Sequence, residues 1–185
     1  MIQIRKIRMD EYKKLYSHMK RDFPANELPP FFVVKRNFDK NVYNGFYLTD
    51  ETSDIGYAVI TAPENLKYAL INYFAILPEY RSKGYGSEFL KIIIGYYPDR
   101  ILVLEADDPA PMKNPVRQNE AVRRVKFYER AGFHVIPIEK AKIFGVDMLI
   151  MASVKDEKIN AREIMHSLYL PAFDSKLWLK FIDVK

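Results

Sequence analysis

Cysteine is absent from the chain of 185 residues. Without a thiol, the protein can form no disulfide, no thiolate metal site and no cysteine nucleophile. This absence fits a reducing compartment, in which disulfides are rare. Histidine is scarce as well, because His18, His134 and His166 lie far apart and show no recognisable ligand spacing. We therefore expect no metal site.

Long apolar runs are also missing. No stretch approaches the roughly 18 apolar residues of a membrane-spanning helix. Residues 1–12 alternate between apolar and polar and do not form the apolar core of a signal peptide. We therefore expect a cytoplasmic protein with no membrane partner.

Charge is not concentrated in one block. The chain has 29 Lys and Arg against 24 Asp and Glu, a net charge of +5, and the two signs are interspersed. This pattern does not favour nucleic acid as a partner. The positive excess either serves solubility or favours an anionic ligand such as a polyphosphate, and charge alone does not decide between the two.

The remaining composition is that of a globular protein, with 49% apolar and 29% charged residues. Strands are predicted at residues 2–7, 43–49, 55–61, 68–77, 101–104, 133–136 and 146–152, and helices at 31–38, 84–97, 119–131 and 157–170, with a further helix that begins at Asp10 as its N-cap. We expect a hairpin turn at 50–54, a loop at the proline-rich stretch 107–115, a helix stop at Gly132, a loop at 137–145 between the last two strands, and an apolar tail at 173–182. This order predicts a mixed α/β fold whose first half is antiparallel.

The transition from the strand at 68–77 to the helix at 84–97 is the most informative segment. Backbone amides at a helix start have no partner within the helix, and the helix dipole adds positive potential, so such an end can bind an anion. Gly84 and Gly86 allow the backbone to approach a ligand closely, and Arg81 and Lys83 add positive charge. The segment therefore suggests a polyphosphate site.

This loop matches neither of two common phosphate-binding motifs. No GKS or GKT follows it, which excludes a P-loop, and Phe89 occupies the place of the third glycine of the dinucleotide fingerprint. Two glycines alone more often serve tight packing between a strand and a helix. The identity of the polyphosphate therefore does not follow from this loop.

Two segments carry a family resemblance. Residues 75–86, AILPEYRSKGYG, resemble the motif of GNAT N-acetyltransferases, a hydrophobic strand followed by Q/R-x-x-G-x-G/A. Residues 127–133, FYERAGF, resemble the Y-x-x-x-G-F segment of the same family. The resemblance covers about residues 1–153 and implies a central mixed sheet of about six to seven strands flanked by helices. Residues 154–185 would form a C-terminal helical extension on this domain or on a partner subunit, so a homodimer is compatible with it.

The resemblance implies acetyl-CoA as cosubstrate and a primary amine, in a small molecule, peptide or protein, as acceptor. The pantetheine arm would lie along the strand that precedes the loop, and loop amides would hold the diphosphate. The cofactor-binding residues that it implies are Phe74, Ala75, Ile76, Arg81, Ser82, Lys83, Gly84, Tyr85, Gly86 and Ser87.

The resemblance also implies catalytic residues for direct attack of the amine on the acetyl carbonyl. Tyr128 matches the tyrosine that protonates the departing thiolate, although it can equally be a core tyrosine. The sequence itself, apart from the resemblance, offers Glu105 at the end of the predicted strand 101–104 as a candidate base if it is desolvated; otherwise it is a solvated strand-end charge or a partner of Arg100. A water chain is an equal alternative for the base.

One part of the family pattern is not present. The asparagine that many members carry seven residues before the tyrosine is replaced by Ala121, and Asn119 lies on a different helix face. Arg124 occupies the position of the family's alanine, near what we expect to be the start of this helix. It is therefore a further candidate for a phosphate contact, or else part of an exposed charged face.

The acceptor itself is not predicted, because the cues near its expected entrance conflict. Asp22 and Glu27 would attract a cationic amine, or they are simply helix-end charges, whereas Lys140 and Lys142 would suit an acidic group. A non-catalytic acyl-CoA-binding module on the same fold is the alternative to an enzyme.

Overall fold

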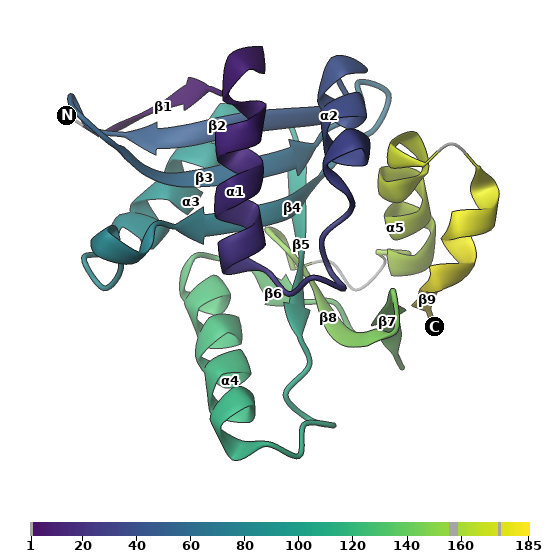
Figure 1. Cartoon of the computed structure of the whole chain (residues 1–185). Coiled ribbons are helices and arrows are strands. Elements are labelled where there is room, and N and C mark those ends of the chain that lie inside the picture. The colour runs from purple at the N-terminus through teal and green to yellow at the C-terminus, as the bar shows by residue number, and fades with distance from the viewer. Residues whose placement is uncertain (1, 156–158, 174) are drawn as a thin grey trace. The chain divides into compact units, whose positions relative to one another are not determined.

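The computed structural model describes residues 2–155, 159–173 and 175–185 (Figure 1). They form two compact units. The first comprises the chain up to Ala62 together with Ile71–Pro98, and the second comprises Pro63–Leu70 and the described residues from Asp99 onward. Each unit combines helices and strands, which confirms the α/β class. The described residues contain nine strands, slightly more than expected. The domain boundary expected after Ser153 stays a prediction.

The first unit is built on antiparallel strands. They are β1 (Gln3–Lys6), β2 (Tyr43–Thr49), β3 (Asp54–Thr61) and the part of β4 (Tyr68–Ile76) from Ile71 onward. The strands follow one another in sheet order, with Tyr47 of β2 opposite Tyr57 of β3. As expected, a tight turn joins β2 to β3, and the Asp50 carboxylate accepts the amides of Thr52 and Ser53 at 2.9 and 2.8 Å. This register sets which side chains of the first unit share a face.

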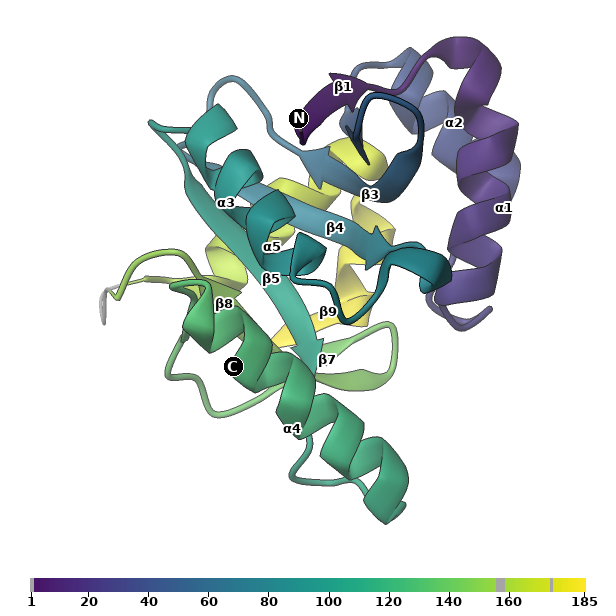
Figure 2. The same ribbon diagram turned by 90° about the vertical axis from the view of Figure 1, so that its left-hand side faces the viewer.

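Helices cover both faces of these strands. They are α1 (Tyr12–Asp22), α2 (Phe31–Asp39) and α3 (Tyr85–Tyr96). Figure 2 shows α1 and α2 on one side of β3 and β4, and α3 on the other. Successive side chains of β2 point to opposite faces of the strands. The ring of Phe46 faces α3, where its centroid lies 4.9 Å from that of Tyr96, and the ring of Tyr47 faces α1, where Lys14 lies over it.

The second unit is centred on β8 (Val146–Ala152). Antiparallel partners of β8 are β5 (Ile101–Asp107), β6 (His134–Val135) and β7 (Ala141–Ile143), and β9 (Ile182–Val184) pairs with β7. The helices are α4 (Pro115–Arg130) and α5 (Ala161–Tyr169), which lie on opposite sides of these strands in Figure 1. The described residues also contain four short 3-10 helices. Two belong to the first unit, η1 (Met9–Glu11) and η2 (Pro78–Tyr80), and two to the second, η3 (Leu170–Ala172) and η4 (Lys176–Phe181).

The apolar core of the second unit lies between α5 and the strands. From α5, Ile164, Met165 and Leu168 pack against Val103 of β5 and Ile150 of β8. The tail that the sequence describes only as apolar also supplies a strand, β9, whose Ile182 and Val184 join this core. The C-terminal extension is therefore partly helical and partly an edge strand of the second unit.

Two predicted helix starts were wrong. The first helix does not use Asp10 as its cap, because Asp10 lies inside η1 and the Glu11 carboxylate caps that turn by accepting the amide of Arg8 at 2.9 Å. The helix predicted from residue 119 begins at Pro115, after Asn114 caps it by accepting two amides. Asparagine before proline is a recognised start signal that the proline-rich appearance of this stretch concealed.

Two other predicted boundaries were wrong, and one falls on residues that the structure does not describe. The strand predicted at 101–104 continues to Asp107, so Glu105 lies within β5 and not at its end. The stretch 137–145, treated as a loop, contains β7. The last helix was expected from Glu157, which lies outside the described residues, and α5 itself begins after Asn160. Gly132 ends α4 with a φ of 91°, as predicted.

Glu11 generates a testable prediction about stability. It is 8% exposed and accepts hydrogen bonds from the guanidinium of Arg5 at 2.8 Å. These bonds lead the causes that lower the pKa of Glu11 from 4.5 to about 2. A carboxyl with a depressed folded-state pKa stabilises the protein fully above its unfolded pKa, and this contribution disappears as the pH falls from about 4.5 to about 2.

We therefore expect Glu11→Gln to lower the free energy of unfolding by about 2–3 kcal/mol at pH 7 and by much less near pH 2. Urea unfolding across this pH range measures the difference between variant and wild type. Asp10→Asn, which changes an exposed carboxylate beside the same cap, is the matched control and should have a small effect. A Glu11→Gln penalty that does not change with pH contradicts the assignment.

Candidate cofactor loop and active site

The end of β4 is fixed tightly against β3. Gly56 of β3 lies so close that a Cβ on it would be 2.6 Å from the carbonyl oxygen of Ala75. The amide of Leu77 donates to a β3 carbonyl at 2.9 Å, which fixes the point where β4 ends. Phe74, Ala75 and Ile76, expected to line the pantetheine arm, are thus the half-buried last residues of a well-anchored strand.

The loop that follows has free backbone amides. Ser82 and Gly84 adopt positive φ angles of 62° and 85°, and Gly84 is the N-cap of α3. Within the described part of the chain, the loop amides that donate to no protein acceptor are those of Ser82, Lys83, Gly84, Tyr85 and Gly86. Consecutive free amides at the positive end of a helix dipole are suited to an anion with several oxygens, such as a diphosphate.

Ser87 differs from its neighbours in the predicted set. Its amide donates to the carbonyl of Gly84 at 3.1 Å, and the amide of Glu88 donates to the same oxygen at 3.3 Å. The Ser87 amide is therefore already used within the first turn of α3. The free amides end one residue before it, a detail that motif matching alone does not reveal.

The cationic side chains of the loop turn back onto the protein. Arg81 donates from Nε to the carbonyl of Ile76 at 2.8 Å and from Nη2 to the carboxylate of Asp22 at 2.8 Å. Lys83 donates to the carbonyl of Glu79 at 3.0 Å. Both side chains are exposed to solvent, yet each already has a protein acceptor, and these hydrogen bonds stabilise the loop. The free donors of this segment therefore belong mainly to the backbone.

Asp22 is the buried anion of this network. Its side chain is 4% exposed, and the carboxylate also accepts from Arg21 at 2.8 Å and from Tyr57 Oη at 3.0 Å. Burial opposes ionisation, but the hydrogen bonds from Arg21 and Tyr57 and the charges of Arg21 and Arg81 outweigh it and lower the pKa of Asp22. The carboxylate is thus ionised at neutral pH and engaged inside the first unit.

Tyr128 lies in the second unit, on the buried side of α4. Its ring contacts Phe133 at 6.2 Å between centroids, and its carbonyl accepts the amide of Phe133 at 3.0 Å as the helix ends. Burial is the main cause that raises the pKa of Tyr128. A phenol with a raised pKa keeps its proton at neutral pH, which a proton donor requires.

Glu105, half-buried in β5, accepts a hydrogen bond from a residue that the sequence did not single out. The hydroxyl of Tyr169, in α5, lies 2.8 and 3.0 Å from the two carboxylate oxygens. The pair is separated by 64 residues. No local pattern therefore predicts it, and Tyr169 becomes a candidate for orienting this carboxylate.

Arg124 is not near a helix start, which corrects the expectation, because α4 begins at Pro115. Its guanidinium pairs with Asp107 of β5 at 2.7 Å and remains half exposed. Ala121, at the position of the family's asparagine, is buried, whereas Asn119 is exposed. The asparagine contact therefore has no counterpart at either position.

The predicted site residues thus fall into two groups. The first unit brings together the end of β4 and the loop up to Ser87, while Tyr128, Glu105 and Arg124 belong to the second unit. Near the expected acceptor entrance, the carbonyl of Glu27 accepts from Tyr73 Oη at 3.1 Å, and Lys142 pairs with Asp147 at 3.5 Å.

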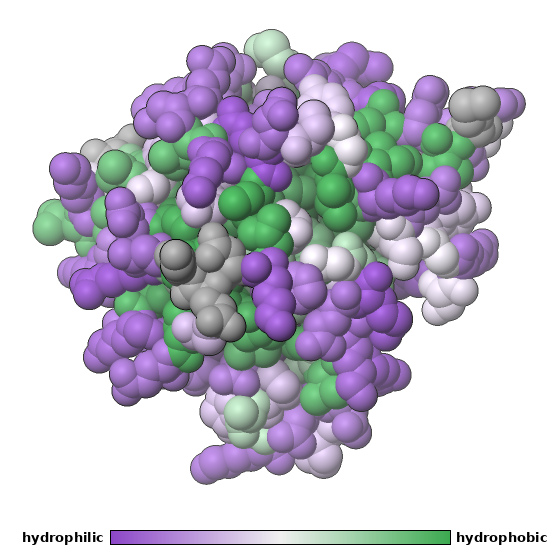
Figure 3. Space-filling view, turned by 180° about the vertical axis from the view of Figure 1, so that it is seen from behind, coloured by the Kyte–Doolittle hydropathy of each residue, from purple (hydrophilic) through white to green (hydrophobic). Residues whose placement is uncertain are grey.

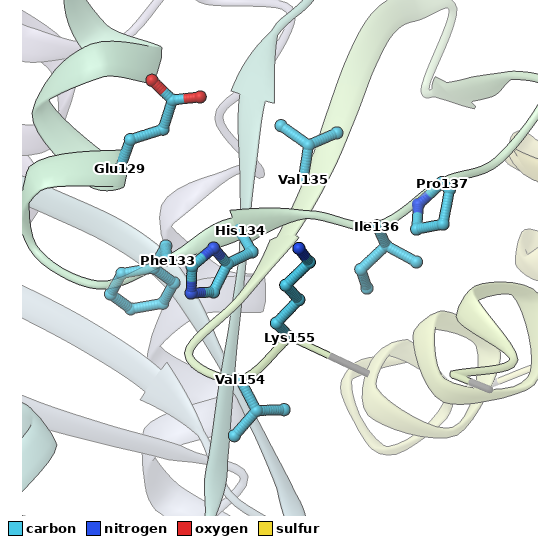
Figure 4. Close-up of a pocket in the computed structure, with 8 residues that line it drawn as sticks. All are labelled: Glu129, Phe133, His134, Val135, Ile136, Pro137, Val154 and Lys155. Atoms are coloured by element: carbon cyan, nitrogen blue, oxygen red, sulfur yellow. The ribbon is translucent and has the colours of Figure 1, made fainter. Parts of the chain in front are cut away.

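A hollow of about 500 Å³ in the second unit contains neither Tyr128 nor Glu105. Figure 4 shows its lining, which comes from the end of α4, from β6 and its neighbours, and from the segment after β8. The residues are Glu129, Phe133, His134, Val135, Ile136, Pro137, Val154 and Lys155. Tyr128 therefore does not line this hollow, although its ring contacts Phe133, which does.

Among the described residues, no group of three or more His, Cys, Asp and Glu side chains could hold a metal ion. No helix in the same residues is long and apolar enough to cross a membrane. Figure 3 shows one face of the molecule, on which hydrophilic side chains predominate and smaller hydrophobic areas lie between them.

Comparison with known proteins identifies the family. The model of the GNAT acetyltransferase domain matches residues 31–135, more than half of the chain. No curated protein matches the chain at a significant level. The chain belongs to the GNAT acetyltransferase family.

Solved structures share the fold at low sequence identity. A GNAT-family acetyltransferase from Bacteroides thetaiotaomicron aligns with a TM-score of 0.76 at 21% identity, over 90% of this chain and 96% of that one. The ribosomal-protein-S18-alanine N-acetyltransferase from Escherichia coli gives 0.56 at 23% identity, over 86% and 99%. A spermidine N-acetyltransferase from Vibrio cholerae, in complex with CoA and spermine, gives 0.62 at 14%, over 82% and 94%.

The loop conformation predicts opposite effects of alanine at two glycines. Gly84→Ala forces a side chain into φ 85°, which should destabilise the protein by about 1 kcal/mol. Gly95, inside α3, has open space around it and an ordinary φ, so Gly95→Ala should stabilise by about 0.5–1 kcal/mol. Urea unfolding of both variants measures the pair. A Gly84→Ala variant that is as stable as wild type, or more stable, would show that the left-handed cap is not formed.

Proposed function

We propose that this protein is an N-acetyltransferase that transfers the acetyl group of acetyl-CoA to a primary amine. The observation that carries the proposal is the run of free amides from Ser82 to Gly86, at a positive-φ loop before α3. In a member of the GNAT family, such a run has the donors that a diphosphate needs. Ser82, Lys83, Gly84, Tyr85 and Gly86 would hold the diphosphate, with Ser87 completing the first turn of the helix.

The acyl end of the cosubstrate would follow β4. Phe74, Ala75 and Ile76 would line the pantetheine arm, and an amide near Ile76 would polarise the thioester carbonyl. A donor of this kind contributes about 3 kcal/mol to transition-state stabilisation in comparable enzymes. The tight packing of Gly56 against Ala75 supports this role, because a donor must be held rigidly to act in this way.

Tyr128 is the proposed acid and Glu105 the proposed base. The amine attacks the acetyl carbonyl, the carbon–sulfur bond breaks, and the phenol of Tyr128 protonates the departing thiolate. The proton that the nitrogen loses as the amide bond forms then restores the phenol. An alkyl amine has a pKa near 10 and must first lose a proton. Glu105, oriented by Tyr169, would accept that proton directly or through a water chain. Arg124 would contribute positive charge for a phosphate from its exposed position beside Asp107.

The acceptor is proposed only as a class. The related structures include proteins named for acetylating spermidine and an alanine of a ribosomal protein, both of which present amines. A small-molecule or peptide amine is therefore the proposed acceptor, and the cytoplasm the proposed location. A homodimer remains compatible with the proposal. The alternative, a non-catalytic acyl-CoA-binding module, predicts the same cofactor binding without turnover.

Two measurements test this function. Calorimetric titration of the purified protein with CoA should show saturable binding. An assay of free thiol should then show release from acetyl-CoA with at least one member of a panel of polyamines, aminoglycosides, amino acids and peptides. Binding without thiol release for any amine supports the non-catalytic module, and no binding of CoA at all rejects both.

The acid role has its own prediction. Tyr128→Phe removes the phenolic proton but keeps the ring, so turnover should fall at least tenfold while the Kd for CoA barely changes. Steady-state kinetics together with calorimetry separate the two quantities. Tyr12→Phe, which alters a buried tyrosine on α1, is the matched control. Unchanged turnover in Tyr128→Phe removes the residue from the mechanism.

A further inference from the structure

The carboxylate of Asp22 is unusual for the last residue of a surface helix. Most such acids are solvated, but this side chain is 4% exposed and accepts from Arg21, Arg81 and Tyr57 at 2.8, 2.8 and 3.0 Å. Burying a charge is costly unless it is paired and hydrogen-bonded. A buried, fully paired carboxylate at this place therefore suggests a role beyond ending the helix.

Its partner Arg81 connects three parts of the first unit. The guanidinium lies between Asp22, at the end of α1, and the carbonyl of Ile76, the last residue of β4, at 2.8 Å from each. Arg81 is also the residue directly before the free amides that begin at Ser82. A planar guanidinium that is hydrogen-bonded on two edges has a fixed orientation. It therefore fixes the start of the loop relative to the end of α1.

The rest of the loop has few ties of this kind. Tyr80 and Arg81 donate their amides to Leu77 and Pro78, and Lys83 donates to Glu79, all within the same segment. Among the described residues, the Asp22 contact is the one side-chain hydrogen bond that joins residues 78–86 to an element earlier than β4. Most residues of the loop are exposed, so this contact is its side-chain tie to α1.

We propose that Asp22 is a positioning residue for the diphosphate site and acts through Arg81. In this role, Arg81 is a structural clamp and not a phosphate ligand, and its fixed guanidinium holds the free amides in the geometry that binds the diphosphate. Tyr57 supports the clamp by fixing the second oxygen of Asp22. The inference rests on the proposed binding of acetyl-CoA by the same loop.

Asp22→Asn tests the clamp with little change in shape. The variant weakens the charge-assisted bond to Arg81, so the Kd for CoA should rise about tenfold. If Arg81 were itself a phosphate ligand, releasing it from Asp22 would leave affinity unchanged or raise it. Inorganic pyrophosphate, used as a competitor of CoA, should weaken by a similar factor, because the defect lies at the diphosphate amides.

A double-mutant cycle with Arg81→Gln shows whether Asp22 acts through Arg81. The double variant should bind CoA no more weakly than Arg81→Gln alone, since both changes break one clamp. Additive losses overturn the inference. Asp39→Asn, at the end of α2 and paired with Lys35, is the matched helix-end control and should leave the Kd unchanged.

Urea unfolding of each variant separates a local defect from a global one. If Asp22→Asn does not fold, Tyr57→Phe removes only one hydrogen bond to Asp22 and should weaken CoA binding about threefold. An unchanged Kd in that variant, or in a folded Asp22→Asn, overturns the clamp while leaving the proposed function intact. A wild-type protein that does not bind CoA overturns both.

Discussion

The transition from β4 to α3 leaves consecutive backbone amides without protein acceptors, and the proposed binding of the diphosphate depends on that fact. The transition is possible because two residues, Ser82 and Gly84, adopt left-handed backbone angles that turn the chain sharply into the helix. Serine adopts such an angle only at some cost, so the surrounding contacts must stabilise it. The hydrogen bonds of Arg81, the residue directly before Ser82, to Asp22 and to the carbonyl of Ile76 are contacts that can do so.

The elements that the sequence predicts well are those with strong local signals. The hairpin at Asp50, the strand from Tyr68, the helix after Gly84 and the glycine stop at Gly132 all follow from residue types within a few positions of one another. In the loop before α3, the two glycines and the apolar strand predict the loop and the helix start correctly, whereas the anion site there stays a prediction. Local chemistry decides local conformation in these segments, and tertiary contacts do not override it.

What could not be predicted depends on contacts between distant residues. Tyr169 reaches Glu105 across 64 residues, and Asp22 reaches Arg81 across 59. The strand β9 is too short to show an alternating pattern and exists because β7 provides an edge for it. The start of α4 was wrongly predicted for a different reason. Asn114 and Pro115 are a local start signal, but the neighbouring prolines made this stretch resemble a loop.

The arrangement of the loop also bears on how charged residues near an anion site should be interpreted. A guanidinium beside a phosphate site suggests a ligand, yet Arg81 already has two protein acceptors at 2.8 Å, one of them a carboxylate. A hydrogen bond to an ionised carboxylate is stronger than one between neutral groups. A phosphate would therefore have to displace Asp22 from Arg81 in order to bind the guanidinium. The backbone amides need no such exchange, since they are free. Binding through the backbone and positioning through side chains are then separate tasks, which allows the loop to keep its geometry whether or not an anion is bound.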